Sequence, residues 1–239
     1  FMLYACFKNE ALAWRFKGTR PDKPLLRDYF RIGSPVLGSS VVSCLGYVVF
    51  ASLVSGMGTT VFAAHSIAVT AETIFYVPGY GLRSASATLI GNARGERNGE
   101  KLKEVGRLSV LLTIGVMLLS GVLLYFGSGA LMRLFTPDAQ VAALGADMLK
   151  IVAFSEPFFG LMIVLEGILY GLGRTRYSFF VETVGMWAVR IFFTFLCVRV
   201  WNLGLNAVWY CMIADNVTKA LLFAVPFLRR GEKSVFRVR

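Results

Sequence analysis

Apolar residues lie in long runs that short polar stretches separate. A transmembrane helix needs roughly 20 mostly apolar residues to cross about 30 Å of hydrocarbon. Six runs meet this length, at 32–56, 61–90, 108–127, 140–172, 177–200 and 205–228. The pattern therefore predicts an all-α membrane protein built as a six-helix transmembrane bundle.

Two of these runs are long and contain a proline. Proline removes a backbone hydrogen bond, which bends or breaks a membrane helix. We therefore predict that both helices are kinked, with helix breaks at Pro78 with Gly79, and at Pro157. No phosphate-binding fingerprint surrounds Gly79-Tyr80-Gly81, so a broken helix is favoured over a nucleotide-binding loop.

The runs divide the chain into three parts. Residues 32–228 form the six-helix lobe. The chain opens on apolar residues, so we read 1–31 as the end of a preceding helix followed by a cytoplasmic linker. Residues 229–239 form a basic cytoplasmic tail.

Most of the 25 Lys and Arg residues lie in every second loop. Cation-rich short loops stay on the cytoplasmic side of a membrane. The basic stretches are the leader before residue 32, the loop at 94–107, the pair Arg174 and Arg176, and the tail after residue 228. The alternation predicts a multi-pass protein of the cell membrane with both termini of this segment in the cytoplasm.

Composition narrows the choice of partner. The chain is 56% hydrophobic and 16% charged, more apolar than a soluble domain can bury, so its main partner is the lipid bilayer. The net charge of +11 does not indicate nucleic acid, because the cations lie in loops between apolar runs. The four cysteines show no ligand spacing, so we expect no metal site and no cofactor.

Ionisable residues inside the runs need a partner or a polar cavity, because lipid does not solvate charge. Asp215 and Lys219 are four apart and can form a local ion pair. Glu182 and Arg190 are eight residues apart, a spacing that fits either a structural anchor or part of a polar cavity. Arg83 is too far from Glu72 for contact, and we expect it to point toward a cytoplasmic cavity.

Glu72 and Glu166 stand in apolar stretches with no cation within one helical turn, so their partners must come from other helices. Glu156 precedes Pro157, and both structural and binding roles remain open for it. Glu72 lies six residues before Pro78, where a kink frees backbone groups that could help bind a cation. We rank Glu72 first as the responsive carboxylate, ahead of Glu166, Glu156 and Glu182.

Several segments resemble transporters of the multidrug and toxic compound extrusion (MATE) family. Residues 64–72, 76–81 and 85–91 resemble the family's eighth helix. Residues 155–157 and 166–175 resemble its tenth helix and the loop that follows. The likeness extends from Leu25 to about Arg230 and is that of the C-terminal half, one lobe of a two-lobe transporter.

The chain departs from the family pattern at two places. Ser43 stands roughly where some members carry an acidic residue in the seventh helix, so ion sites of that branch do not transfer. Arg174 stands in a loop that often reads Gly-Asp-Thr. The acidic cluster of the family's first lobe lies outside this sequence.

The resemblance implies an antiporter, coupled to H⁺ or Na⁺, that exports amphipathic organic cations by alternating access, with an N-terminal lobe as partner. The alternative is a lipid-linked saccharide flippase of the same superfamily, which Arg83 and Arg190 facing a shared cavity would favour. An intramembrane enzyme needs a nucleophile or metal constellation that the motifs do not supply, so we expect no catalytic residues. A purely structural membrane subunit would have every buried charge paired.

Overall fold

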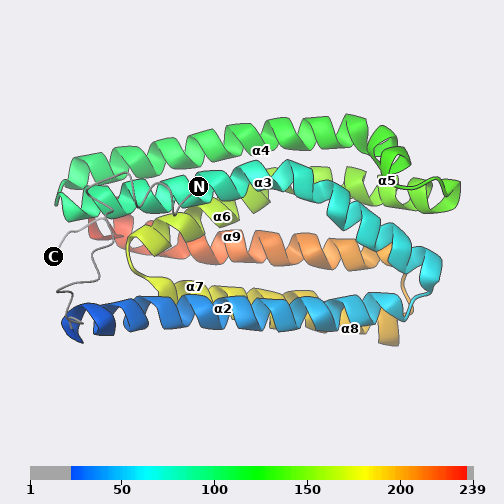
Figure 1. The fold of residues 1–239 in the computed structure, drawn as a ribbon, viewed down its shortest axis with the longest axis horizontal. Coiled ribbons are helices and arrows are strands. Elements are labelled where there is room, and N and C mark those ends of the chain that lie inside the picture. The colour runs from blue at the N-terminus through cyan, green and yellow to red at the C-terminus, as the bar shows by residue number, and fades with distance from the viewer. Residues whose placement is uncertain (1–22, 236–239) are drawn as a thin grey trace, which may run out of the picture.

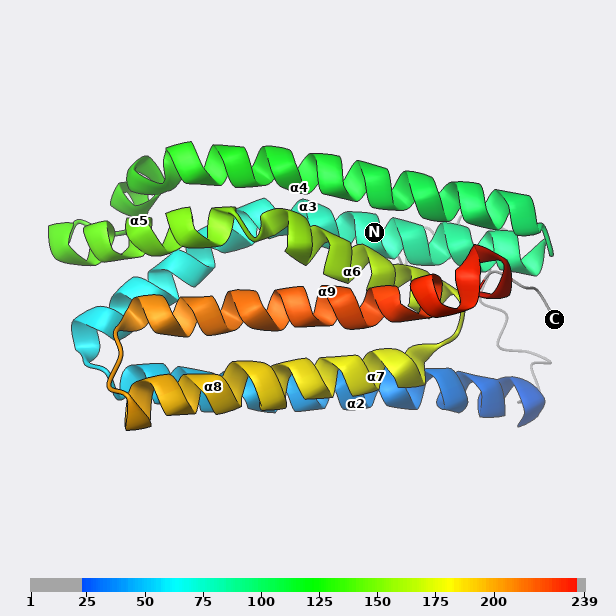
Figure 2. The same cartoon turned by 180° about the vertical axis from the view of Figure 1, so that it is seen from behind.

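The computed structural model describes residues 23–235 as a bundle of helices with no strand in that range. The elements are α2 (Lys23–Ser55), α3 (Thr59–Gly95), α4 (Gly99–Phe135), α5 (Ala139–Ala153), α6 (Glu156–Gly171), α7 (Thr175–Thr183), η2 (Val184–Ile191), α8 (Phe192–Phe195), η3 (Leu196–Val200) and α9 (Leu205–Val235). Here η denotes a π-helix. Helix α2 lies beside α7 and α8, the helices α3 to α6 form the opposite side, and α9 runs between the two sides (Figures 1 and 2).

The predicted all-α membrane fold is confirmed. Five helical stretches are each long and apolar enough to cross a membrane. Helices α5 and α6 meet at a bend of 58° and together make a sixth candidate span. Pro157 lies in the first turn of α6, so the predicted break at this proline coincides with the bend.

The predicted break at Pro78 and Gly79 is wrong, because α3 continues through both residues. Figure 1 shows α3 changing direction along its length instead of being interrupted. Gly79 is buried, and a side chain there would meet Ile163 of α6 and Met117 of α4. Tight packing by neighbouring helices explains how α3 keeps its helical form around the proline.

The helices also extend past the predicted lobe boundaries of 32 and 228. Helix α2 begins at Lys23, inside the predicted linker, and α9 continues to Val235, inside the predicted tail. The rest of the predicted linker, with the end of a preceding helix, and the rest of the tail lie outside the described residues.

Helix α4 shows why the bundle suits a lipid environment. Its buried face carries small and hydroxyl residues, including Ser109, Thr113 and Ser120. Its exposed face carries large apolar residues such as Leu119 and Phe126. Small residues let membrane helices approach closely, while the large apolar side chains meet lipid. A soluble helix would show the reverse distribution.

Helices α3 and α6 make close contact through two glycines of α6, four residues apart. A Cβ atom at Gly167 would lie 2.6 Å from the Arg83 carbonyl oxygen. A Cβ atom at Gly171 would lie 2.5 Å from the Ala87 carbonyl oxygen. The spacing is that of a small-xxx-small contact, and only glycine leaves room for the α3 backbone.

We expect Gly167→Ala to destabilise the lobe by about 1–3 kcal/mol, because the added methyl group meets backbone that cannot move aside. Thermal denaturation of the purified protein in detergent measures the loss. Gly115→Ala on α4 is the matched control, since nothing lies within 4 Å of a Cβ atom there. Equal melting temperatures for the two variants would contradict the close contact.

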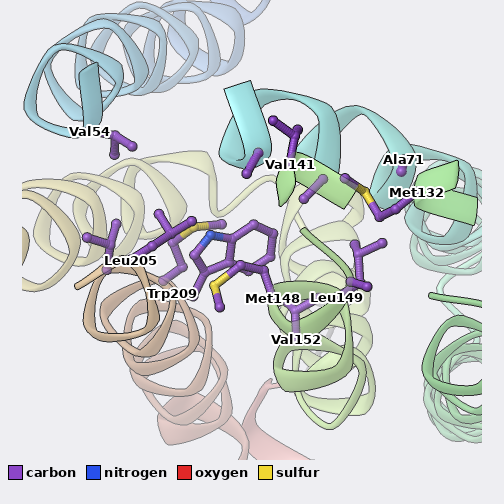
Figure 3. Packing of buried hydrophobic residues seen from close by; sticks show 14 of the residues in the cluster. Val54, Ala71, Met132, Val141, Met148, Leu149, Val152, Leu205 and Trp209 are labelled. Atoms are coloured by element: carbon purple, nitrogen blue, oxygen red, sulfur yellow. The ribbon is translucent and has the colours of Figure 1, made fainter. Parts of the chain in front are cut away.

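Two apolar clusters form the core. One surrounds Trp209 and gathers residues of α2, α3, α4, α5, η3 and α9, among them Val54, Met132 and Leu149 (Figure 3). The other includes Ile90, Leu102, Leu169 and Phe223. Along both α3 and α9 the two clusters occupy separate stretches, and most of the buried polar residues lie between them, with His65 of α3 inside the first cluster.

Candidate functional site

Buried polar residues form a layer between the two apolar clusters. On α3, Glu72 follows the first cluster and precedes the residues of the second. On α9, Asp215, Asn216 and Lys219 lie between Met212 of the first cluster and Ala220 of the second. The fold therefore collects ionisable side chains from different helices at one level of the bundle.

Four charged side chains, three of them buried and Glu182 largely so, form a network across α7, η2 and α9. Arg190 Nε lies 2.8 Å from Asp215 Oδ2. Lys219 Nζ lies 3.0 Å from Glu182 Oε2 and 3.3 Å from Asp215 Oδ2. Arg190 Nη2 also donates to Asn216 Oδ1 at 3.3 Å. Two acids and two bases balance, so the network adds no net charge.

This network changes the interpretation of two predicted pairs. The local pair of Asp215 with Lys219 is present, but Asp215 also binds Arg190. Glu182 and Arg190 are joined through α9, and the α-helical spacing assumed for them does not hold because Val184–Ile191 is π-helical. A π-helix changes the direction in which successive side chains point. Of the two readings left open, the anchor fits the observed contacts.

Glu166 of α6 is satisfied by two side chains. Arg83 Nη1 of α3 donates to Glu166 Oε2 at 2.6 Å, and the Tyr170 hydroxyl donates to Glu166 Oε1 at 2.7 Å. The expectation of a partner from another helix is therefore confirmed for Glu166. The guanidinium of Arg83 binds this buried carboxylate while its side chain stays 32% exposed, so the expectation that Arg83 points toward a cytoplasmic cavity stays a prediction.

Glu72 of α3 and Glu156 of α6 remain without such partners. Both side chains are buried. Within residues 23–235, neither carboxylate forms an ion pair, and Glu156 Oε2 has no hydrogen-bond partner. The charge of Glu72 acts on Glu156, and that of Arg190 acts on Glu72. The arginine whose charge acts on Glu72 is thus already paired with Asp215.

Such a pair can hold a cation or a proton. Two buried carboxylates near one another repel when both are charged, and a bound cation or proton removes the repulsion. Pro157 follows Glu156 directly at the bend between α5 and α6, so a movement of that bend would shift Glu156 relative to Glu72. The pair of carboxylates can therefore respond both to a bound ion and to a movement of the α5–α6 bend.

Comparison with known proteins identifies the family. The family model described as MatE matches residues 35–196, more than half of the chain. The chain belongs to the MatE family. A relative in Thermotoga maritima, named probable multidrug resistance protein NorM, is 28% identical over 95% of the chain and 49% of its own length.

Solved structures share the MatE fold. A MATE crystal structure in the bent conformation matches 98% of the chain with a TM-score of 0.87 and 18% identity, and the match covers 52% of that structure. A second match is a MOP superfamily transporter from Pyrococcus furiosus, described as having a binding pocket of reverse polarity. It matches 98% of the chain with a TM-score of 0.87 and 18% identity, and the match covers 53% of that structure. The chain therefore spans about half the length of the relatives it matches.

Reading the sequence missed three side chains of this layer of buried charges. Tyr170, Asn216 and Tyr47 each contact a buried charge: Tyr170 binds Glu166, Asn216 accepts from Arg190, and the Arg190 guanidinium lies 5.6 Å from the Tyr47 ring centre. For Tyr170 a signal existed, since it lies one helical turn after Glu166. The other two belong to different elements from their partners, and spacing along the chain gives no sign of the contact.

Proposed function

We propose that the chain is the second lobe of an antiporter of the cell membrane, coupled to H⁺ or Na⁺, that exports amphipathic organic cations. The observation that carries this proposal is the pair of buried carboxylates, Glu72 and Glu156, without partner cations among the described residues. The name of the Thermotoga maritima relative supports multidrug transport. The missing partner is a first lobe, since transport by alternating access needs two lobes around a midplane site.

The coupling ion and the cationic substrate compete for the carboxylates, and this competition couples their opposite movements across the membrane. An ion or proton at Glu72 and Glu156 removes the negative charge that would attract a cationic substrate. When the bend at Pro157 moves, the site opens to the other side and exchanges one cation for the other. Glu166, Glu182 and Arg190 hold the surrounding helices through their pairs.

A lipid-linked saccharide flippase would need a cationic cavity that holds phosphate. Within the layer of buried charges, Arg83 and Arg190 are the arginines that would supply it, and each is paired with a carboxylate, at 2.6 Å and 2.8 Å. These pairs favour the cation antiporter over the flippase.

The test uses the complete two-lobe transporter in proteoliposomes. Addition of an organic cation such as tetraphenylphosphonium should drive efflux of H⁺ or Na⁺, followed with a pH-sensitive or a sodium-sensitive dye. The dye that responds identifies the coupling ion. Substrate movement without movement of either ion would disprove coupled antiport.

We expect the turns at the two ends of α3 to face opposite sides of the membrane, with the basic α3–α4 turn in the cytoplasm. Helix α3 has 37 residues, enough to cross the bilayer. Thr60→Cys and Glu100→Cys, each in a cysteine-free background, place exposed thiols at the two ends. A membrane-impermeant maleimide added to intact cells should label only Thr60→Cys, and labelling of both would contradict the topology.

A further inference from the structure

A cavity of about 730 Å³ lies at the end of the bundle where α6 turns into α7. The start of α2, the end of α3 and the last part of α9 meet at this same end (Figure 1). Its volume falls within the roughly 300–1,000 Å³ of ligand sites in proteins. It lies apart from the layer of buried charges that contains Glu72 and Glu156.

Arginine dominates the polar lining. Four of the lining residues are arginines, contributed by α2, α3, the α6–α7 turn and α7: Arg31, Arg94, Arg174 and Arg176. No carboxylate lines the cavity among the described residues. Like charges around one cavity repel each other, so an anion that binds there removes the repulsion and adds attraction.

Backbone N–H groups at a helix N-terminus add to the positive potential of the cavity. The helical stretch Thr175–Val200 begins at the cavity, and within the described part of the chain no side-chain hydrogen bond caps its N-terminus. The first N–H groups of a helix have no acceptor within the helix and favour an anion. Arg94 Nη1 donates to the Leu172 carbonyl oxygen, which fixes this arginine against the turn.

Apolar residues complete the lining. Ile32, Val225 and Pro226 line the same cavity as the arginines. Next to Arg31 on α2, the side chains of Tyr29 and Phe30 are 77% and 69% exposed, as expected of residues that meet lipid. A ligand here would therefore meet arginines at one part and apolar surface at another.

We propose that this cavity binds the phosphate group of an anion, with Arg31, Arg94 and Arg176 as its ligands. Guanidinium groups bind phosphate through paired hydrogen bonds, and basic pockets between transmembrane helices bind anionic headgroups. The mixture of arginines and apolar lining fits a phospholipid whose headgroup enters the cavity while its chains stay in the bilayer. A soluble phosphate compound shares the same chemistry, and the experiment separates the two sources.

The test measures binding to the full 239-residue chain purified in a neutral detergent, by native mass spectrometry. Dioleoylphosphatidylglycerol, dioleoylphosphatidylcholine and inorganic pyrophosphate are titrated separately. We expect the anionic lipid to bind more tightly than the zwitterionic one. Arg31→Gln and Arg176→Gln should each weaken it about fivefold, in line with the contribution of one basic residue near an anionic surface.

Arg107→Gln is the matched control, because Arg107 is an exposed arginine of α4 outside the lining of the cavity. It should leave binding unchanged, and both test variants replace exposed side chains, so folding should survive. Pyrophosphate binding that is lost in the same two variants, without lipid binding, would support the site and assign it to a soluble anion. Equal binding by wild type, both test variants and the control, for every probe, would overturn the proposal.

Discussion

Replacing Glu72 with Gln in the complete transporter should abolish coupled efflux while leaving folding and membrane insertion intact. Glutamine keeps the size of the side chain and most of its hydrogen bonding, but it carries no charge and does not titrate. Interactions that involve a charged group are worth about 1.5–3 kcal/mol, so binding of the organic cation should weaken at least tenfold. The dependence of binding on pH should also flatten, because one of the two titrating carboxylates is gone.

Equilibrium binding at several pH values and transport in proteoliposomes measure this effect. Glu104→Gln is the matched control, since Glu104 is an exposed glutamate of α4. It should transport like the wild type. Wild-type efflux by the Glu72→Gln variant at equal expression would show that the charge at this position is not needed.

The two carboxylates should act as one unit. Glu156→Gln should impair transport as Glu72→Gln does, because both acids are buried and the charge of Glu72 on α3 acts on Glu156 on α6. The double variant should then be little worse than either single one, since a coupled pair gives non-additive losses. Strictly additive losses would indicate two independent roles.

Local patterns in the sequence account for most of the fold. The span of α4 could be read from its own apolar run, and Pro157 marked the bend between α5 and α6 because a proline acts on its own helix. The same rule predicted a break at Pro78, where α3 in fact stays helical. Whether a proline breaks or merely bends a helix depends on neighbours such as Ile163 and Met117, which come from other helices.

The site was harder to predict because its contacts join distant parts of the chain. Arg83 and Glu166 are 83 residues apart, so no spacing rule connects them. Arg190 reaches Asp215 from a π-helical stretch, which hydrophobic periodicity does not reveal. In the sequence, the arginines of the cavity at the α6–α7 turn indicate membrane orientation, and Arg174 marks a departure from the family's loop, but their convergence exists only in the folded bundle.

Asp215 should be the most sensitive position for the stability of the lobe. Its carboxylate is fully buried and is the one group in the network that lies close to both Arg190 and Lys219. Removing one partner of a buried ion pair costs about 3–5 kcal/mol, because the remaining charge is left without compensation. Asp215→Asn leaves Arg190 uncompensated and Lys219 with Glu182 alone, so it should lower the yield of folded protein severely.

A balanced change should be much less harmful. Glu182→Gln with Lys219→Met removes one acid and one base together and keeps the pair of Arg190 with Asp215. Thermal denaturation in detergent and the fraction of monodisperse protein compare the variants. Asp147→Asn is the control, an exposed acid whose loss should change stability by less than about 0.5 kcal/mol. If Asp215→Asn proved as stable as this control, the network could not be what holds α7, η2 and α9 together.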